Sequence, residues 1–133
     1  MAVDLWETRQ CHCLAARRRA RAVTRHFEAR LREHGLRATQ FSILAVLALA
    51  GPMAMRRLAA MLGLERTTLT RSATLLEREG WIRTGRTKDA RERPLILTQT
   101  GRRKLEAAYP SWKEAQDSLP KETQAWPAAA GSR

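Results

Sequence analysis

The centre of the sequence constrains the fold more than any other part. Residues 55–62 form an apolar-periodic stretch that ends at Gly63. Residues 66–80 follow, and their apolar and polar members separate onto two sides at about 100° per residue. Residues 81–84 and 94–97 then flank a loop rich in arginine. This order predicts two helices joined by a tight glycine turn and followed by a basic hairpin.

The polar side of residues 66–80 is suited to a DNA groove. Leu69, Ala73 and Leu76 fall on the apolar side, whereas the opposite side carries threonine and arginine. Threonine hydroxyls reach phosphates or base edges, and arginine can bind guanine through two hydrogen bonds. On this helix we therefore predict the following DNA-binding residues: Arg66, Thr67, Thr68, Thr70, Arg71 and Thr74.

Positive charge is distributed unevenly along the 133 residues. Lys and Arg total 25 against 13 acidic residues, and the excess lies in residues 1–40 (9 against 4) and 81–104 (8 against 2). Two basic regions are typical of a protein that binds a polyanion, although arginine can also serve solubility alone. From the hairpin we add Arg86, Lys88 and Arg93 to the predicted DNA-binding residues.

Three further helices are expected around the same core. Residues 8–33 repeat apolar side chains at spacings of three and four. Residues 40–50, with Thr39 as the N-cap, are apolar around most of the circumference and should be buried. Residues 99–119, capped by Thr98, carry a heptad-like apolar stripe. The predicted fold class is mostly α with a small β-hairpin wing, in the order α-α-α-α-β-β-α.

The pattern predicts one domain over residues 1–119 and a flexible tail over residues 120–133. The longest apolar stretch, residues 41–50, is shorter than the roughly 20 residues that cross a membrane. A secretory signal is not visible either, so we expect a cytoplasmic protein. The sequence carries no phosphate-binding loop, nucleophile motif or metal motif. Neither enzymatic activity nor a cofactor is expected.

Four motifs in the right order and spacing resemble the MarR family of bacterial regulators. They are residues 35–41, residues 58–64 with 67–71, the Leu-Glu-Arg-Glu-Gly of residues 76–80 with 81–82, and the Asp-Ala-Arg of residues 89–91 with 97–101. The resemblance covers about residues 9–119. It implies a winged helix-turn-helix regulator, in most cases a repressor, that binds pseudo-palindromic double-stranded DNA as a homodimer.

The resemblance also assigns roles. Arg91 would enter the minor groove, where narrow A·T-rich stretches attract arginine, and Asp89 would orient its guanidinium. Residues 8–35 and 98–119 would dimerise, and residues 39–97 would bind DNA. A small anionic aromatic or phenolic effector would bind between these regions and release the DNA. The family's sixth helix has no periodic counterpart after residue 119, so we expect a shortened C-terminal dimerisation region.

Cys11 and Cys13 leave a second hypothesis open, a thiol-based redox-sensing regulator. A peroxide-sensing branch of the family has a reactive cysteine near the start of the first helix. On one continuous helix, residues two apart point to nearly opposite sides, so Cys11 and Cys13 are not expected to bridge. Together with His12, His26 and His34 they match no zinc-site spacing, and no metal is expected. A non-specific basic DNA-binding protein is a third hypothesis.

Overall fold

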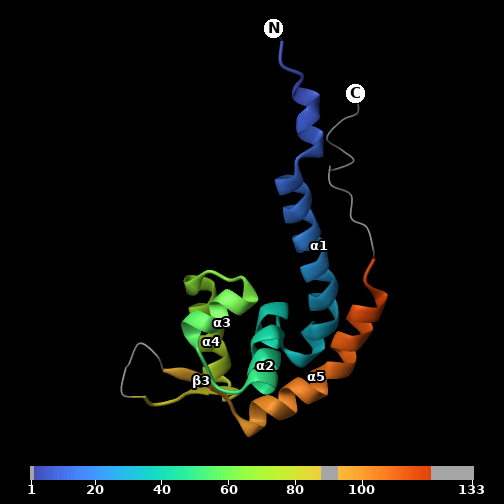
Figure 1. Cartoon of the computed structure of the whole chain (residues 1–133). Helices are drawn as coiled ribbons and strands as arrows, with labels where there is room; N and C mark the ends of the chain where they lie inside the picture. The colour runs from blue at the N-terminus through green and yellow to red at the C-terminus, as the bar shows by residue number, and fades with distance from the viewer. Residues whose placement is uncertain (1, 88–92, 121–133) are drawn as a thin grey trace.

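The computed structural model describes residues 2–87 and 93–120. A small sheet lies at one edge of the helical domain, and the long helix α1 rises beyond the rest of the domain (Figure 1). The elements in chain order, with η for a 3-10 helix, are η1 (Leu5–Gln10), α1 (His12–Leu31), η2 (Arg32–His34), α2 (Ala38–Ala50), β1 (Met53–Ala54), α3 (Met55–Leu62), α4 (Arg66–Arg78), β2 (Ile82–Thr84), β3 (Pro94–Leu97) and α5 (Gln99–Ser118). The predicted fold class is confirmed.

The predicted first helix is not continuous. Cys11, between η1 and α1, has an extended backbone with φ −62° and ψ 115°. Two local hydrogen bonds organise η1 as a separate turn: Asp4 Oδ1 accepts from the Trp6 N–H at 3.1 Å, and Thr8 Oγ1 donates to the Leu5 carbonyl at 2.8 Å. Asp4 thus caps η1, and both bonds lie within the turn, which ends where the backbone becomes extended at Cys11.

The predicted cap of α2 is also wrong. The helix begins at Ala38, so Thr39 lies inside it. The Arg37 N–H donates to Gln40 Oε1 at 2.9 Å, and the Ala38 N–H donates to Glu28 Oε2 of α1 at 3.3 Å. A carboxylate is favourable there because the first turn of a helix carries unpaired N–H groups and a partial positive charge. The bond to Gln40 is local, whereas the bond to Glu28 is a tertiary contact that no local pattern predicts.

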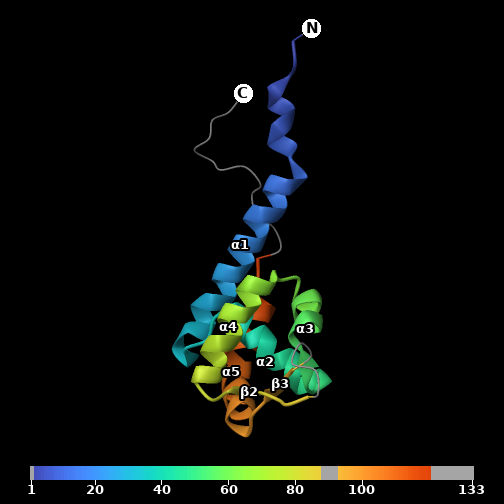
Figure 2. The same ribbon diagram turned by 90° about the vertical axis from the view of Figure 1, so that its left-hand side faces the viewer.

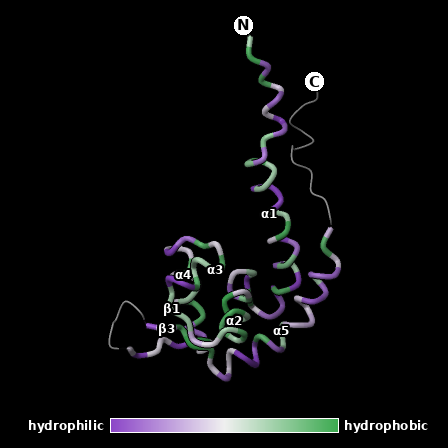
Figure 3. The backbone as a smooth tube through the Cα atoms, in the orientation of Figure 1, coloured by the Kyte–Doolittle hydropathy of each residue, from purple (hydrophilic) through white to green (hydrophobic). Residues whose placement is uncertain are grey.

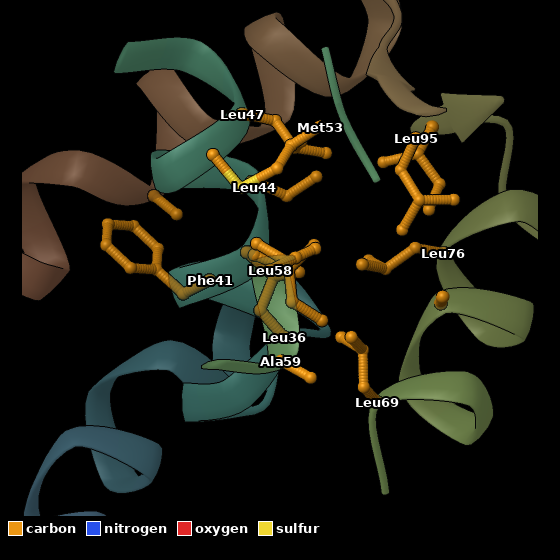
Figure 4. Close-up of a cluster of buried hydrophobic side chains, with 14 of the residues drawn as sticks. Leu36, Phe41, Leu44, Leu47, Met53, Leu58, Ala59, Leu69, Leu76 and Leu95 are labelled. Carbon is orange, nitrogen blue, oxygen red and sulfur yellow. The ribbon is translucent and has the colours of Figure 1, made fainter. Parts of the chain in front are cut away.

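The core is built around α2, as its apolar sequence predicts. Figure 3 shows hydrophobic residues gathered along this helix, and Figure 4 shows side chains from the neighbouring elements pointing toward them. The large side chains that are essentially inaccessible to solvent are Leu31, Ile43, Leu44, Leu58, Leu69, Leu76 and Ile82. Because α1, α3, α4 and the hairpin all contribute to one cluster, the outer face of α4 is held by a single core.

A two-residue strand, β1, was not predicted. It pairs antiparallel with β3, where Met53 lies opposite Leu95, and β3 also pairs with β2, where Ile82 lies opposite Leu97. The strand order is β1-β3-β2. Two residues are too short to show an alternating pattern, so periodicity could not reveal β1. Among residues 2–87 and 93–120, no helix combines the length and apolar character that a membrane crossing requires.

Candidate DNA-binding surface

The inner face of α4 fixes the direction of its outer face. Leu69 and Leu76 are fully buried, and Ala73 is 4% exposed. The turn between α3 and α4 is made by Gly63, which has a left-handed backbone (φ 65°), and the Leu64 N–H donates to the Ala59 carbonyl at 3.0 Å. Glycine suits this position because it adopts a left-handed backbone without steric penalty. The two helices therefore form a helix-turn-helix.

All six side chains predicted on this helix are exposed: Arg66, Thr67, Thr68, Thr70, Arg71 and Thr74. At about 100° per residue, Thr67, Arg71 and Thr74 share the middle of the outer face. Thr68 lies on one flank beside Leu75, a half-exposed apolar side chain that was not predicted. Arg66 and Thr70 lie toward the other flank.

The threonine hydroxyls are already oriented. Thr70 Oγ1 donates to the Arg66 carbonyl at 2.8 Å, and Thr74 Oγ1 donates to the Thr70 carbonyl at 2.8 Å. Since these hydrogens are used within the helix, the two hydroxyls offer lone pairs to an outside partner. Such an acceptor is suited to the amino group of adenine or cytosine, and the threonine methyl is suited to the methyl of thymine. The guanidinium of Arg71 offers N–H donors, which are suited to the acceptor atoms of guanine.

Only some of the residues that were predicted on the hairpin belong to the described part of the chain. Arg86 and Arg93 are exposed at the two sides of the loop, and the Gly85 N–H donates to the Pro94 carbonyl at 2.7 Å between the strands. Lys88, Asp89 and Arg91 lie outside the described residues. Their predicted roles therefore stay predictions.

Three exposed arginines near this surface were missed by the sequence argument: Arg56 and Arg57 at the start of α3, and Arg83 on β2. The alternation of buried Ile82 with exposed Arg83 is the signal that could have revealed the last of them. The first helix of a helix-turn-helix crosses the DNA backbone, so Arg56 and Arg57 are suited to phosphate contacts.

Hydrogen bonds join α4 to the hairpin. Thr84 Oγ1 of β2 donates to Glu77 Oε1 of α4 at 3.1 Å, and the Trp81 N–H donates to the Leu76 carbonyl at 3.0 Å. Thr98 caps α5 as predicted, because its hydroxyl accepts from the Gly101 N–H at 3.0 Å. The bonds from Thr84 and Trp81 hold α4 and the hairpin in one relative orientation.

Cys11 and Cys13 are both exposed free thiols. Contrary to the prediction, Cys11 and Cys13 do not lie on one continuous helix, because the extended Cys11 precedes α1. Arg17 Nη2 lies 3.4 Å from Cys13 Sγ. The local geometry therefore leaves the redox hypothesis open.

The fold and the basic, threonine-rich face of α4 define a winged helix-turn-helix DNA-binding protein. A sequence model described as MarR family matches residues 34–92. The uncharacterized HTH-type transcriptional regulator YwoH of Bacillus subtilis (strain 168) is 32% identical over 87 residues, which are 65% of this chain and 64% of that protein.

Solved structures of transcriptional regulators also resemble this chain. The M. tuberculosis transcriptional regulator MosR in complex with DNA is 40% identical, with a TM-score of 0.75 over 88% of this chain and 86% of that chain. Reduced AbfR bound to DNA is 26% identical, with a TM-score of 0.69 over 77% and 75% of the two chains. AbfR with a disulfide formed has a TM-score of 0.61 at 26% identity, over 77% and 71%. The chain belongs to the MarR family, whose members are transcriptional regulators and not enzymes.

Proposed function

We propose that this protein is a sequence-specific transcriptional repressor that binds a pseudo-palindromic site in double-stranded DNA as a homodimer. The observation that carries the proposal is the outer face of α4, where arginine and threonine are exposed on a helix fixed by buried leucines. The DNA complexes of MosR and AbfR support it.

In the proposed complex, α4 lies in the major groove and the wing lies along the neighbouring minor groove. Arg71 donates to guanine, and Thr70 and Thr74 accept from base amino groups through hydroxyls whose hydrogens bond their own helix. Arg91 enters the minor groove and Asp89 orients it, while Arg86, Lys88 and Arg93 contact phosphates.

We assign dimerisation to residues 8–35 and 98–119, and DNA binding to residues 39–97. The two dimerisation segments already contact each other within one protomer. His26 Nε2 lies 2.8 Å from the Ala115 carbonyl oxygen, and Arg30 Nε lies 3.7 Å from Glu114 Oε1. A change in the angle between these helices would therefore change the separation of the two α4 helices in a dimer.

For effector release, the best-supported place is a hollow of about 270 Å³ at the junction of α1, η2 and α2. It is lined by Glu28, Arg32, Gly35, Leu36 and Arg37. Its guanidinium groups suit a small anionic aromatic or phenolic compound. Such a ligand would compete with Glu28, which holds Arg37 at 3.2 Å and caps α2, and so would move α1 relative to the DNA-binding part.

The test is selection of bound DNA from a random library. We expect enrichment of two inverted half-sites whose centres are about 10 base pairs apart. The Arg71→Ala variant should recover sites with one less constrained position in each half. If no sequence were enriched and all duplexes bound with equal affinity, the protein would be a non-specific basic DNA-binding protein.

A thiol-based redox regulator is the second candidate. The exposed thiols, the extended backbone of Cys11 and the disulfide form of AbfR support it. Hydrogen peroxide would oxidise the two thiols: its O–O bond would break as the sulfur–sulfur bond forms, and it would take up both thiol hydrogens and leave as two water molecules. If this candidate is correct, peroxide should release DNA from the native protein but not from Cys11→Ser, and mass spectrometry should show a loss of two hydrogens.

A further inference from the structure

Leu75 is an apolar side chain on the outer side of α4. It is 40% exposed, whereas Leu69, Ala73 and Leu76 of the same helix are buried in the core. A single exposed leucine is common on protein surfaces and needs no explanation by itself. What distinguishes Leu75 is its position, because the neighbouring side chains on its side of α4 belong to the candidate DNA-binding surface.

Helix geometry places Leu75 beside Arg71 and Thr68. At about 100° per residue, Leu75 is turned about 40° from Arg71 and about 20° from Thr68 around the helix axis. Residues four apart on a helix have neighbouring Cβ atoms, about 6 Å from each other. Thr74, the preceding residue, contacts bases in the proposed complex. A DNA groove that encloses these side chains therefore extends to Leu75.

The free end of α1, which we assign to dimerisation, is remote from α4. The recognition helix packs against α2, α3 and β2. In both Figure 1 and Figure 2, α1 rises away from the end of the domain that holds α3, α4 and the hairpin. A second copy that binds along the upper part of α1 would therefore leave α4 uncovered. DNA is the partner to which the outer face of α4 is suited.

The leucine side chain selects among the groups that DNA presents. It has no polar atom, so it can bind neither a phosphate nor the donors and acceptors of a base edge. In the major groove, the apolar group that a base presents is the C5-methyl of thymine. A leucine that packs against this methyl removes apolar surface of both groups from water, which is favourable.

We propose that Leu75 is a specificity-determining residue that recognises thymine through its C5-methyl, a role that rests on the proposed function of α4 in the major groove. Consecutive bases of a strand are about 3.4 Å apart along the axis, and the Cβ atoms of Arg71 and Leu75 are about 6 Å apart. The thymine therefore lies within about two base pairs of the base pair that Arg71 contacts. Each half-site contains one such thymine, because each protomer contributes one Leu75.

The experiment removes the methyl without changing any hydrogen bond of the base. Deoxyuridine pairs as thymidine does but lacks the C5-methyl. Each thymine of the selected site is therefore replaced by uracil, in both half-sites at once, and fluorescence anisotropy gives the dissociation constants of the uracil and thymine duplexes. For the native protein we expect their ratio to reach about 15-fold at the proposed position, since each lost methyl contact contributes about fourfold.

The Leu75→Ala variant should lower this ratio to about twofold or less and leave the ratios at other thymines unchanged, including any that face threonine methyls. Leu75→Met keeps an apolar side chain of similar size, so most of the ratio should return. A variant that merely destabilised the protein or the dimer would bind both duplexes more weakly, and the ratio would stay the same. Circular dichroism checks that both variants are folded.

The matched control is Leu49→Ala, which shortens a leucine that is 90% exposed near the end of α2. Its ratios should equal those of the native protein, whatever its absolute affinity. Equal ratios in Leu75→Ala and the native protein would overturn the proposal and would indicate contact with backbone sugars instead. A selected site without a thymine within about two base pairs of the position that Arg71 determines would overturn it as well. A failure of the proposed function is distinguishable, because the native protein would then select no site at all.

Discussion

The hydroxyl of Thr98 donates a hydrogen bond to the carbonyl of Gly80, with Oγ1 and O 2.6 Å apart. The same oxygen accepts from the Gly101 N–H at 3.0 Å. One side chain thus joins Gly80, just after α4, to the first turn of α5, and these two segments lie on either side of the hairpin in sequence. The orientation of the DNA-binding surface relative to α5 depends on this link.

Replacing Thr98 by valine should therefore destabilise the protein by about 1–2 kcal/mol, because the cap and the bond to Gly80 are lost together. Urea unfolding measures the change. Thr100→Val is the control, since Thr100 is exposed on the same helix and should change stability by less than about 0.5 kcal/mol. If both variants lost the same stability, the link through Thr98 would have no special role.

Gly101 is closely enclosed by its neighbours. A Cβ atom there would overlap the Trp81 carbonyl oxygen and lie 2.8 Å from Leu97 Cδ1. Gly101→Ala should therefore destabilise the protein by about 1–3 kcal/mol, although alanine favours a helix. Thermal unfolding tests this prediction. A gain in stability, as helix propensity alone predicts, would show that α5 can move away from the hairpin at little cost.

Arg71 should account for part of the sequence preference. Arg71→Ala is expected to weaken specific binding by about 1–3 kcal/mol and to relax the preference at one base pair in each half-site. Fluorescence anisotropy on a set of single-base variants of the site measures both effects. Arg103→Ala removes an equal charge from α5 and should leave the preference unchanged. An unaltered preference in folded Arg71→Ala would exclude this side chain from base contact.

Arg91→Ala should weaken DNA binding and lower its salt dependence, because a cation in the minor groove would be lost. Asp89→Asn should have a smaller effect, since the guanidinium stays and loses only its orientation. Binding isotherms at several salt concentrations compare the two variants. Equal effects of both changes would indicate that Asp89 acts other than by orienting Arg91.

The sequence predicted the elements whose periodicity extends over several turns. α3, α4 and α5 begin at the predicted residues, and the exposed face of α4 follows from its 3.6-residue pattern. The sequence did not reveal features that depend on contacts. Glu28 caps α2 from another helix, β1 has two residues, and the backbone becomes extended at Cys11 between η1 and α1.

The charge on the first helix illustrates the same limit for function. Counting bases located an excess in residues 1–40, but it could not tell a solvated helix from a binding surface. The alignment of Arg17, Arg21 and Arg25 along one side follows from helix geometry. That Glu28 binds Arg37 and the Ala38 N–H is visible only in the structure.

Dimerisation should extend beyond residues 8–35 to the apolar residues that precede them. Leu5 is 71% exposed and Val3 is 79% exposed, and Figure 1 shows this segment beyond the body of the domain. Burying a leucine side chain contributes about 1.5–3 kcal/mol, so Leu5→Ser should raise the dimer dissociation constant by roughly 10- to 100-fold. Leu49→Ser, at a residue 90% exposed on α2, is the matched control and should leave the dimer unchanged. Sedimentation measures the dimer dissociation constants of the two variants. A dimer binds a duplex with two half-sites far more tightly than a duplex with one. The affinities for these two duplexes therefore report the loss of the dimer. A native protein that is monomeric at tens of micromolar and binds both duplexes equally would overturn the dimeric mechanism.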